Sequence, residues 1–366
     1  MIIFGTMKRK KTLLILTLLL PVQIVLVQWF SKYPQHIEQV YSNGMYPHIS
    51  RFLRVLFGWM PFSMGDVLIF GLILFLFYKL LQIIGSKFKK TLIKTLQITA
   101  LFSVLYGCFY LFWGFNYFRE PLAKNLNIKN AQYTTRQLLD LNEKLVLLLN
   151  ETHSKLTSND SLLVNNAYTT QDLYHQATVG YDFLAKTYPQ FAYSTPSVKS
   201  SLMSLAQTYN STLGYLNPIT GEAQINNRIP KTSIPATTCH EMAHQIGWAA
   251  ENEANFVGFL AATSNPDLFF QYSGYRMAFS YAFAELRKRN AALASIVWEK
   301  VHLGIVKDYQ ETSKFWQAYQ NPIEPYIKKG YNSYLKANKQ ANGIDSYDYV
   351  VDLLIGYYAI EAPKDS

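Results

Sequence analysis

The sequence predicts a mainly α protein in which three transmembrane helices precede an α-rich domain (α+β, with a small sheet). Hydrophobic residues make up 49% of the 366 residues and charged residues only 16%, whereas a soluble domain has about 25% charged residues. Three long apolar runs occupy the first third of the chain, and helical periodicity dominates the remainder. Two cysteines are too few for a disulfide-rich secreted scaffold or a four-cysteine zinc site.

The net charge of +10 comes entirely from the first third of the chain. Residues 1–114 contain 12 Lys and Arg against 2 Asp and Glu, whereas residues 115–366 contain 22 of each class. A nucleic-acid-binding protein needs a basic face on its folded domain, and the domain here is neutral. We therefore expect the lipid bilayer as a partner and expect no nucleic acid.

The apolar runs are long enough to cross a membrane, since each has the roughly 20 residues that a helix needs to cross the hydrocarbon core. They cover about residues 13–30, 67–84 and 92–114. A cleaved signal peptide is the alternative for the first run. However, bulky residues (Gln28, Trp29, Phe30) follow Val27, where a cleavage site has small ones. We therefore predict that residues 1–114 form a membrane anchor.

Basic residues at the ends of these runs predict the orientation of the anchor. The first span is preceded by a cluster of four (8–11), and three crowd the short loop between spans two and three (Lys87, Lys89, Lys90). The positive-inside rule then places the N-terminus and this loop in the cytoplasm. We therefore predict a multi-pass protein of the cell (inner) membrane, with residues 115–366 extracytoplasmic or periplasmic.

The longer loop between spans one and two contains a predicted helix. Apolar residues recur there at helical spacing, and Arg51 and Arg54 are expected on another face. The apolar set is Ile49, Phe52, Leu53, Leu56 and Phe57. We expect this helix to lie in the membrane interface and to end at Gly58 and Pro61.

The domain over residues 115–366 is predicted to be helical with one clear strand. A helix from Thr135 to about Lys155 has a leucine stripe, and a second helix begins at Thr170 and ends before Pro189. Residues 221–229 alternate polar and apolar and are the strand candidate. Further helices are expected at 236–246, 251–263, 273–289, 292–309, 312–320 and 346–360, the last capped by Ser346.

The motif that carries chemistry is His240-Glu241-Met242-Ala243-His244. Positions four apart lie on one face of a helix, so the imidazoles of His240 and His244 could hold one zinc ion. Glu241 lies one step round the helix, where it could reach a water beside the metal and act as the catalytic base. The composition of the chain predicts only roughly 0.005 chance occurrences of this motif.

A catalytic zinc needs a third protein ligand, and the segment after the motif offers two. Gly247 can adopt a positive φ and end the first helix sharply, so that a second helix returns past it from Glu251. Glu251 is the preferred ligand and Glu253 the alternative, because Asn255 lies one turn after Glu251 on the same face. There the Asn255 amide could hydrogen-bond the second nitrogen of a ligand histidine.

The two segments 240–244 and 251–255, His-Glu-x-x-His and Glu-x-x-Ala-Asn, resemble the gluzincin zinc peptidases. Two membrane groups with this core, the CAAX-prenyl-type peptidases and the β-lactam sensor-transducers, also combine it with spans. The chain is more similar still to an uncharacterised bacterial family of three-span proteins. The shared segments are 113–117, 240–256, 334–338 and 346–347. The resemblance implies a zincin-like metallopeptidase domain but no substrate.

This resemblance implies hydrolysis of peptide bonds outside the cytoplasm, with zinc as cofactor and a peptide or protein as substrate. Zinc lowers the pKa of a bound water and polarises the scissile carbonyl, and Glu241 transfers the proton to the leaving nitrogen. A side chain that stabilises the oxyanion is also expected. The candidates are Tyr275, Tyr281, His302, Tyr331 and Tyr334. The strand 221–229 could be an edge that pairs with an extended substrate.

Two other functions fit the same residues. One is a non-catalytic zinc-containing sensor or scaffold that binds peptides or cell-wall fragments, although binding alone does not need Glu241. The other is an intramembrane protease, which the polar surroundings of His240 disfavour. The remaining histidines His36, His48, His153 and His175 have no metal-ligand spacing and are expected to be ordinary surface or core residues.

Overall fold

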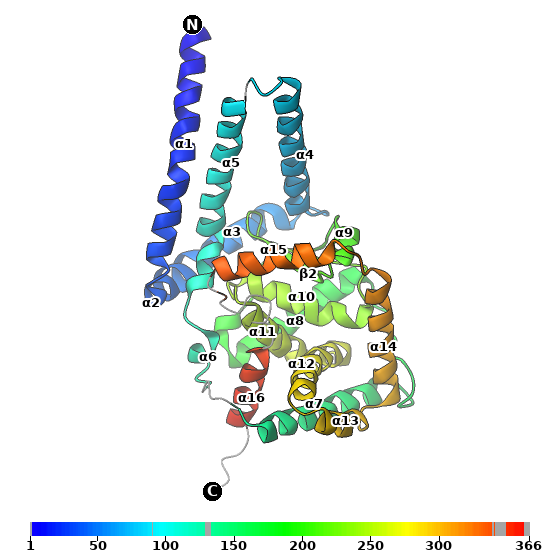
Figure 1. The fold of residues 1–366 in the computed structure, drawn as a ribbon. Helices are drawn as coiled ribbons and strands as arrows, with labels where there is room; N and C mark the ends of the chain where they lie inside the picture. The colour runs from blue at the N-terminus through cyan, green and yellow to red at the C-terminus, as the bar shows by residue number, and fades with distance from the viewer. Residues whose placement is uncertain (1, 90, 129–132, 339, 341–348, 362–366) are drawn as a thin grey trace.

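The computed structural model describes residues 2–89, 91–128, 133–338, 340 and 349–361. Lys90 of the predicted cytoplasmic loop and the predicted cap Ser346 lie outside these residues. The fold is mainly α with a small three-stranded sheet, as predicted (Figure 1).

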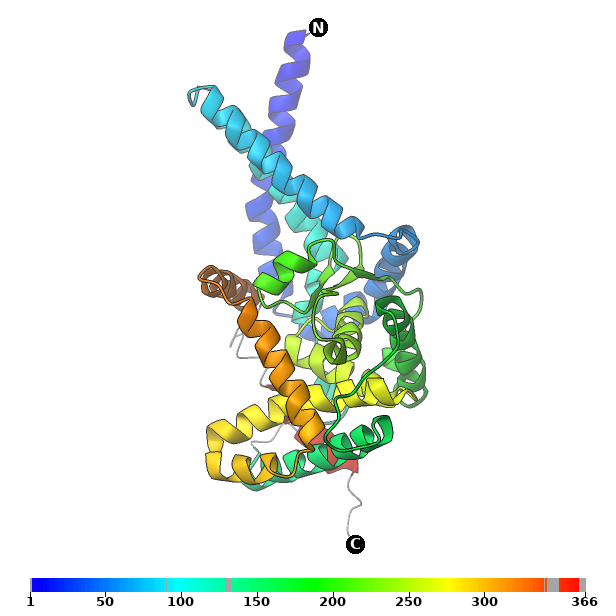
Figure 2. The same ribbon diagram turned by 90° about the vertical axis from the view of Figure 1, so that its right-hand side faces the viewer.

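Three helices near the N-terminus are long and apolar enough to span a membrane, which confirms the three predicted apolar helices. They are α1 (Ile2–Phe30), α4 (Met64–Gly85) and α5 (Thr91–Phe112). α1 packs along α5, where the hydroxyls of Thr17 and Thr99 lie 3.1 Å apart. All three project from one end of the domain (Figures 1 and 2).

The loop between α1 and α4 is helical and packs on the domain. It comprises α2 (Pro34–His36), a π-helix (Ile37–Met45) and α3 (Tyr46–Gly58). The predicted helix is therefore present, but the prediction that Arg54 lies on a polar face with Arg51 is wrong. Arg54 is buried, and its guanidinium lies 4.8 Å from the centre of the Tyr193 ring. One face of α3 contacts the domain, and its other face is apolar and exposed.

The sheet has the order β1-β3-β2, with β1 (Val198–Ser200) parallel and β2 (Gly214–Asn217) antiparallel to β3 (Glu222–Ile225). The predicted strand is thus β3, which forms between the buried turn at Thr220 and Pro230. The expectation that it is an edge strand is wrong, because β3 is central and pairs on both sides. The edge strands are β1 and β2.

The remaining helices form the body of the domain around α11, which is buried on almost every side because its residues are apolar or small all round. They are α6 (Leu122–Asn125), α7 (Thr135–Leu156), α8 (Thr170–Thr187), α9 (Ser204–Tyr209), α10 (Ile234–Gln245), α11 (Glu251–Ser264), α12 (Leu268–Arg289), α13 (Ala291–Trp298), α14 (Leu303–Ala318), α15 (Glu324–Ala337) and α16 (Val350–Glu361). Short 3-10 turns cover Gly114–Phe118, Pro189–Phe191 and Lys231–Ser233.

Two helical predictions need correction. The sequence suggested helices at 292–309 and 312–320, but the chain breaks earlier, between α13 and α14, where His302 precedes the first residue of α14. α15 was not predicted at all. It begins at Glu324 and Pro325, and Leu335 is its only buried side chain among the described residues, so it lacks the buried stripe that identifies a helix.

Close packing of α10 on α11 places the His240–His244 motif against the first turn of α11. Gly258 of α11 lies against the backbone of His240, where an added Cβ would come within 2.9 Å of the His240 nitrogen. Any side chain at this position would push the two helices apart. The approach brings the first turn of α11, which begins at Glu251, beside the histidines of α10.

Candidate metal centre

The structure brings His240, His244 and Glu251 together. Pro235 occupies the first turn of α10, where its missing N–H costs nothing, and the two histidines follow on one face. The Nε2 atoms of His240 and His244 lie 3.3 Å and 3.5 Å from the same oxygen, Oε2 of Glu251. Their rings are 4.7 Å apart and nearly perpendicular. Three potential ligand atoms therefore converge on one point.

These separations fit a tetrahedral zinc. Zn–N bonds of about 2.0–2.1 Å and Zn–O bonds of about 2.0–2.2 Å place neighbouring ligand atoms about 3.4 Å apart. The two nitrogen-to-oxygen distances, 3.3 Å and 3.5 Å, bracket that value. Two imidazole nitrogens and one carboxylate oxygen are also the donor set of many hydrolytic zinc sites.

The tautomer of His244 is fixed by the backbone. Its Nδ1–H donates to the carbonyl oxygen of Trp248 at 2.7 Å, which leaves the lone pair on Nε2 in the neutral ring. Gly247, at a φ of +96°, ends α10 and turns the chain so that this carbonyl returns to the ring. The turn at Gly247 that the sequence predicted is therefore confirmed, and it orients a candidate ligand.

Two buried atoms at the centre have no hydrogen-bond partner within the described part of the chain. They are Nδ1 of His240 and Oε2 of Glu241. A buried polar atom without a partner costs about 1–3 kcal/mol, so such atoms indicate a missing water, ion or ligand. Glu241 directly follows His240 in the sequence, and its carboxylate is buried.

The charges of the centre are those of a buried ion pair between the imidazoles and Glu251. Burial acts to lower the pKa of His244, but the Glu251 carboxylate outweighs it and raises this pKa to about 9. Burial acts to raise the pKa of Glu251, and the two imidazoles overcome it and hold this pKa well below its usual range. Burial raises the pKa of Glu241. A divalent cation would take the place of the proton shared by the imidazoles and Glu251.

Glu253 and Asn255 form hydrogen bonds with residues other than the two histidines. Oε1 of Glu253 accepts the backbone N–H of Leu122 at 2.6 Å, on the opposite side of α11 from Glu251. Asn255 donates from Nδ2 to the hydroxyl of Tyr281 at 3.2 Å. Asn255 was expected to hydrogen-bond the second nitrogen of a ligand histidine. For His244 that partner is the Trp248 carbonyl instead.

Of the candidate oxyanion residues, Tyr331 lies closest to the centre. Its hydroxyl donates to Oε1 of Glu251 at 2.7 Å, so α15 covers the centre with this side chain. Tyr334 stacks on Tyr331 and accepts the hydroxyl of Tyr117 at 3.2 Å. Burial raises the pKa of Tyr117 well above its usual value, so it stays a proton donor. Tyr117 was not among the sequence candidates, since tyrosines are too frequent for one to stand out.

Of the other three candidates, Tyr281 accepts the Asn255 amide, and Tyr275 and His302 lie elsewhere. Tyr275 packs its ring against Phe259 within the core. His302 lies beside His153, with their Nδ1 atoms 3.3 Å apart, and near the Asp160 carboxylate. His153 is a buried core histidine, as expected, although His302 lies beside it. His153 donates from Nε2 to the carbonyl of Leu162, which leaves its Nδ1 to accept a hydrogen bond from His302.

Residues from the anchor hold the C-terminal end of α10. The hydroxyls of Tyr46 and Ser50 on α3 donate to the Gln245 carbonyl at 2.9 Å and 2.6 Å. The indole of Trp113, directly after α5, donates to the His244 carbonyl at 3.0 Å. The last carbonyls of a helix have no partner within it, and here the anchor supplies partners. These contacts could not be predicted from the sequence, because their acceptors are backbone atoms.

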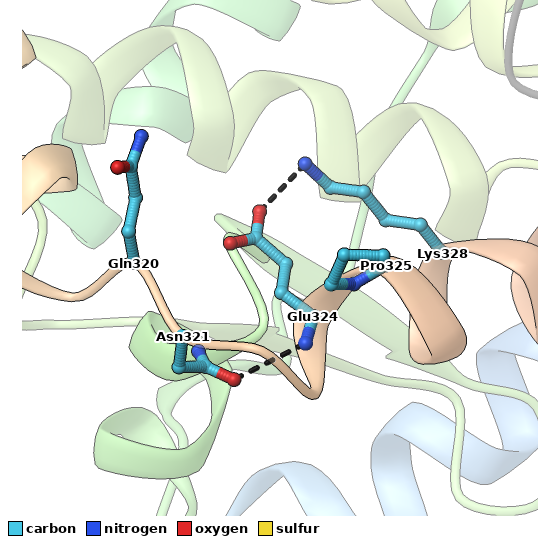
Figure 3. Close-up of a pocket in the computed structure, with 5 residues that line it drawn as sticks. All are labelled: Gln320, Asn321, Glu324, Pro325 and Lys328. Atoms are coloured by element: carbon cyan, nitrogen blue, oxygen red, sulfur yellow. Dashed lines mark hydrogen bonds and ion pairs between the residues drawn. The ribbon is translucent and has the colours of Figure 1, made fainter.

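The edge strand β2 lies against Glu241, and a groove lies at the start of α15. An added Cβ at Gly214, the first residue of β2, would come within 2.9 Å of Oε1 of Glu241. Three residues earlier, Ser211 donates to Glu324 at 2.6 Å, at the edge of a groove of about 580 Å³ (Figure 3). The groove is lined by Gln320, Asn321, Glu324, Pro325 and Lys328.

A comparison with protein families finds one match. A family model described as "Protein of unknown function (DUF3810)" matches residues 41–355, which include α3, α4, α5 and the whole candidate centre. The match agrees with the expected resemblance to a family of unknown function. No curated protein and no solved structure matches the chain. The metal centre and the peptidase activity therefore stay predictions.

Proposed function

We propose that this chain, which belongs to the DUF3810 family of proteins of unknown function, is a membrane-anchored zinc peptidase. The observation that carries the proposal is the convergence of three ligand atoms beside an unpartnered carboxylate. Both Nε2 atoms lie within 3.5 Å of one Glu251 oxygen, and Oε2 of Glu241 is buried without a partner among the described residues. That arrangement supports hydrolysis better than structural zinc binding, which needs four protein ligands.

In this proposal His240, His244 and Glu251 would hold zinc, which supplies a Lewis acid for the scissile carbonyl when it is bound. Glu241 accepts a proton from the attacking water at its free oxygen and delivers it to the leaving nitrogen. Burial raises the pKa of Glu241, which suits a group that must first take up a proton and then release it. Tyr331, on the Glu251 carboxylate, is the nearest candidate to stabilise the oxyanion.

The substrate would bind as an extended strand along β2. β2 is an edge strand, so the backbone groups of its outer side have no partner strand within the sheet and could pair with a peptide at its less buried end, Gly214 and Tyr215. Gly214 places this edge against Glu241. The groove before α15, reached through Ser211 and Glu324, would take the side chains of a bound peptide. The substrate-binding role that the sequence assigned to β3 thus passes to β2.

The proposal places the centre outside the cytoplasm. Basic residues flank the first span and crowd the loop between α4 and α5, and the positive-inside rule puts both in the cytoplasm. With three crossings, the domain would lie on the opposite side of the cell membrane. A peptidase there would act on extracytoplasmic polypeptides.

Replacing the base tests the proposal in the purified full chain. We expect Glu241→Gln to retain zinc and to lower peptide hydrolysis by about 10²–10⁴-fold, because the ligands stay and the proton acceptor is lost. Bound zinc is measured by mass spectrometry and hydrolysis on a mixed-sequence peptide library. His175→Ala, at an exposed histidine of α8, is the matched control. Unchanged hydrolysis in Glu241→Gln would overturn the proposed activity.

A second function, a zinc-containing sensor that binds peptides without cleaving them, is favoured by the closed state of the centre. Glu241, His244 and Glu251 are all about 5% exposed or less, and Tyr331 covers Glu251. A sensor would give the same peptide affinity in wild type and Glu241→Gln, with no hydrolysis in either. The same two proteins therefore distinguish the two functions.

A further inference from the structure

Exposed apolar side chains gather where the domain meets the spans. We call the set Phe52, Leu56, Trp59, Phe62, Leu202 and Leu205 the membrane-side patch, and each is at least 42% exposed. Contiguous exposed apolar surface in a folded protein marks an interaction site. The patch lies on two segments that are far apart in sequence, the α3–α4 region and the start of α9.

The patch is continuous with the first turn of α4. Phe62 directly precedes Ser63, which caps α4 through a hydrogen bond from the Asp66 N–H at 2.9 Å. On the other side, the N–H of Leu202 donates to Oδ2 of Asp66 at 2.7 Å. Both views place α3 and α9 beside the lower end of α4 (Figures 1 and 2). The patch therefore surrounds the point where a candidate span leaves the domain.

The composition of the patch suits a lipid surface. Residues 39–65 contain no Asp or Glu, and Arg51 is exposed next to Phe52. Tryptophan and other aromatic residues favour the headgroup layer, as Trp59 and the two phenylalanines would here. A basic side chain beside them attracts anionic lipids. The occupant that this chemistry indicates is the bilayer that holds α4.

The candidate metal centre lies on the other face of the same helix. α3 exposes Phe52 and Leu56 on one side, and on the other Tyr46 and Ser50 bind the carbonyl of Gln245, next to His244. A helix with its side chains is about 10–12 Å thick. The end of α10 that α3 holds is therefore about one helix diameter from the patch, and the candidate ligand His244 directly precedes Gln245 at that end. Trp113, directly after α5, also contacts the candidate centre, because its indole donates to the His244 carbonyl.

We infer that the membrane-side patch rests in the headgroup layer, and that the centre acts on polypeptides anchored in the same bilayer. The second statement rests on the proposed peptidase function. An extended chain advances about 3.3 Å per residue, so a segment leaving the hydrocarbon core covers one helix diameter in about three to four residues. The substrate class is thus a lipid-anchored or membrane-spanning polypeptide, cleaved close to its anchor.

Depth measurement tests the lipid contact without any assumption about activity. Single cysteines replace Leu56 and Leu202 in a Cys108→Ser background, where Cys239 is buried and stays. The full chain, labelled with a nitrobenzoxadiazole dye, is placed in vesicles of phosphatidylethanolamine and phosphatidylglycerol. Leu147→Cys is the control, because it is apolar, 58% exposed and on α7, at the far end of the domain (Figure 1).

We expect nitroxide-bearing lipids to quench the labels at 56 and 202 at least about twofold, and the label at 147 not at all. Equal quenching at all three positions would overturn the lipid contact. Should the two variants fail to fold, the emission of Trp59 offers a second measurement. Brominated lipids should quench the wild type more strongly than Trp59→Ser.

Anchoring of the substrate is tested with two forms of one peptide library. Mixed-sequence decapeptides carry either a palmitoyl or an acetyl group and are presented to the zinc-loaded full chain in the same vesicles. We expect about tenfold faster hydrolysis of the palmitoyl form, with cuts within five residues of the lipid. Equal rates, or cuts spread evenly, overturn the substrate class. If neither form is cleaved more than by Glu241→Gln, the proposed peptidase function fails and the substrate class with it, whereas the dye measurement still decides the lipid contact.

Discussion

His240 and His244 are equivalent in sequence spacing but are held differently. The i, i+4 spacing placed both imidazoles on one face, and the structure adds a hydrogen bond from Nδ1–H of His244 to the carbonyl of Trp248 that fixes the tautomer. The sequence could not indicate this partner, because a backbone carbonyl has no residue type. The expectation for Asn255 failed for a different reason, because its amide donates to the Tyr281 hydroxyl, which tertiary packing of α12 brings beside it.

The choice between Glu251 and Glu253 gives the first prediction. Glu251→Gln should weaken zinc binding by more than about 100-fold, because loss of a supporting group alone costs about 10–100-fold and this carboxylate faces both imidazoles. Glu253→Gln should leave zinc affinity unchanged, since its oxygen accepts the Leu122 N–H. Competition with a zinc-sensitive dye measures both affinities. The reverse order would make Glu253 the ligand.

Gly214 gives the second prediction. In Gly214→Ala the new Cβ would lie within 2.9 Å of the Glu241 side chain and 2.8 Å of the Gln224 carbonyl, so Glu241 must shift. A displacement of about 1 Å can cost about 100-fold in rate. We expect such a loss in peptide turnover with zinc content unchanged. Gly330→Ala, on α15 with nothing within 4 Å of the new Cβ, is the control. Full activity in Gly214→Ala would contradict this placement of Glu241.

At the scale of helices and strands, the elements that composition and periodicity determine were predicted. The elements that depend on tertiary contacts were not. The spans and α7 follow from long apolar runs and a leucine stripe, and their positions are confirmed. β1 and β2 have only three and four residues, too short to show alternation. α15 contacts the rest of the chain through Tyr331, Tyr334 and Leu335, and Leu335 is its only buried residue among those described, so its sequence has no buried stripe to read.

The contact between α12 and α14 predicts how the stability of the protein changes with pH. The hydroxyl of Tyr272 donates to Asp308, and burial raises the pKa of Asp308 above its usual value. A carboxyl group with a raised pKa in the folded state favours folding most below its unfolded pKa, about 3.9. This contribution is lost as the pH rises through the folded pKa. Asp308→Asn removes the titration and keeps an oxygen to accept the Tyr272 hydroxyl.

We therefore expect the melting temperature of wild type, relative to Asp308→Asn, to fall as the pH is raised from about 4 to 7. Both proteins are treated with a chelator, so that loss of metal in acid does not contribute. Scanning calorimetry or a dye-based melting assay gives the two curves. A difference that rises with pH would mean that the pKa of Asp308 is lowered, and would contradict its assignment.

At the scale of the whole molecule, the anchor and the domain share one polar framework. The buried Glu222 of β3 accepts the N–H of Gly65 at 2.6 Å, in the first turn of α4, and pairs with Lys199 of β1 at 2.5 Å. Lys199 in turn donates to the carbonyls of Phe57 and Phe62, around the end of α3. Composition separates residues 1–114 from the rest, yet these buried bonds cross that division.

A fragment that begins at Asn116 should therefore be unstable. It lacks Tyr46, Ser50 and Trp113, which bind the last carbonyls of α10, and it leaves the Lys199–Glu222 pair without its α4 partners. We expect aggregation, or zinc occupancy at least about fivefold below that of the full chain. Co-expression of residues 1–115 as a separate polypeptide should restore soluble, zinc-binding complex in detergent. A stable fragment with full zinc occupancy would show that the anchor contributes nothing to the centre.

The most direct test of the central claim is X-ray absorption at the zinc edge of the purified full chain. The account predicts about one zinc per chain, a first shell of nitrogen and oxygen only at about 2.0–2.1 Å, and outer scattering from two imidazoles. His240→Ala should lose the metal. A chain that takes up no zinc, or a zinc with sulfur at about 2.3 Å or with fewer than two imidazoles, would contradict it.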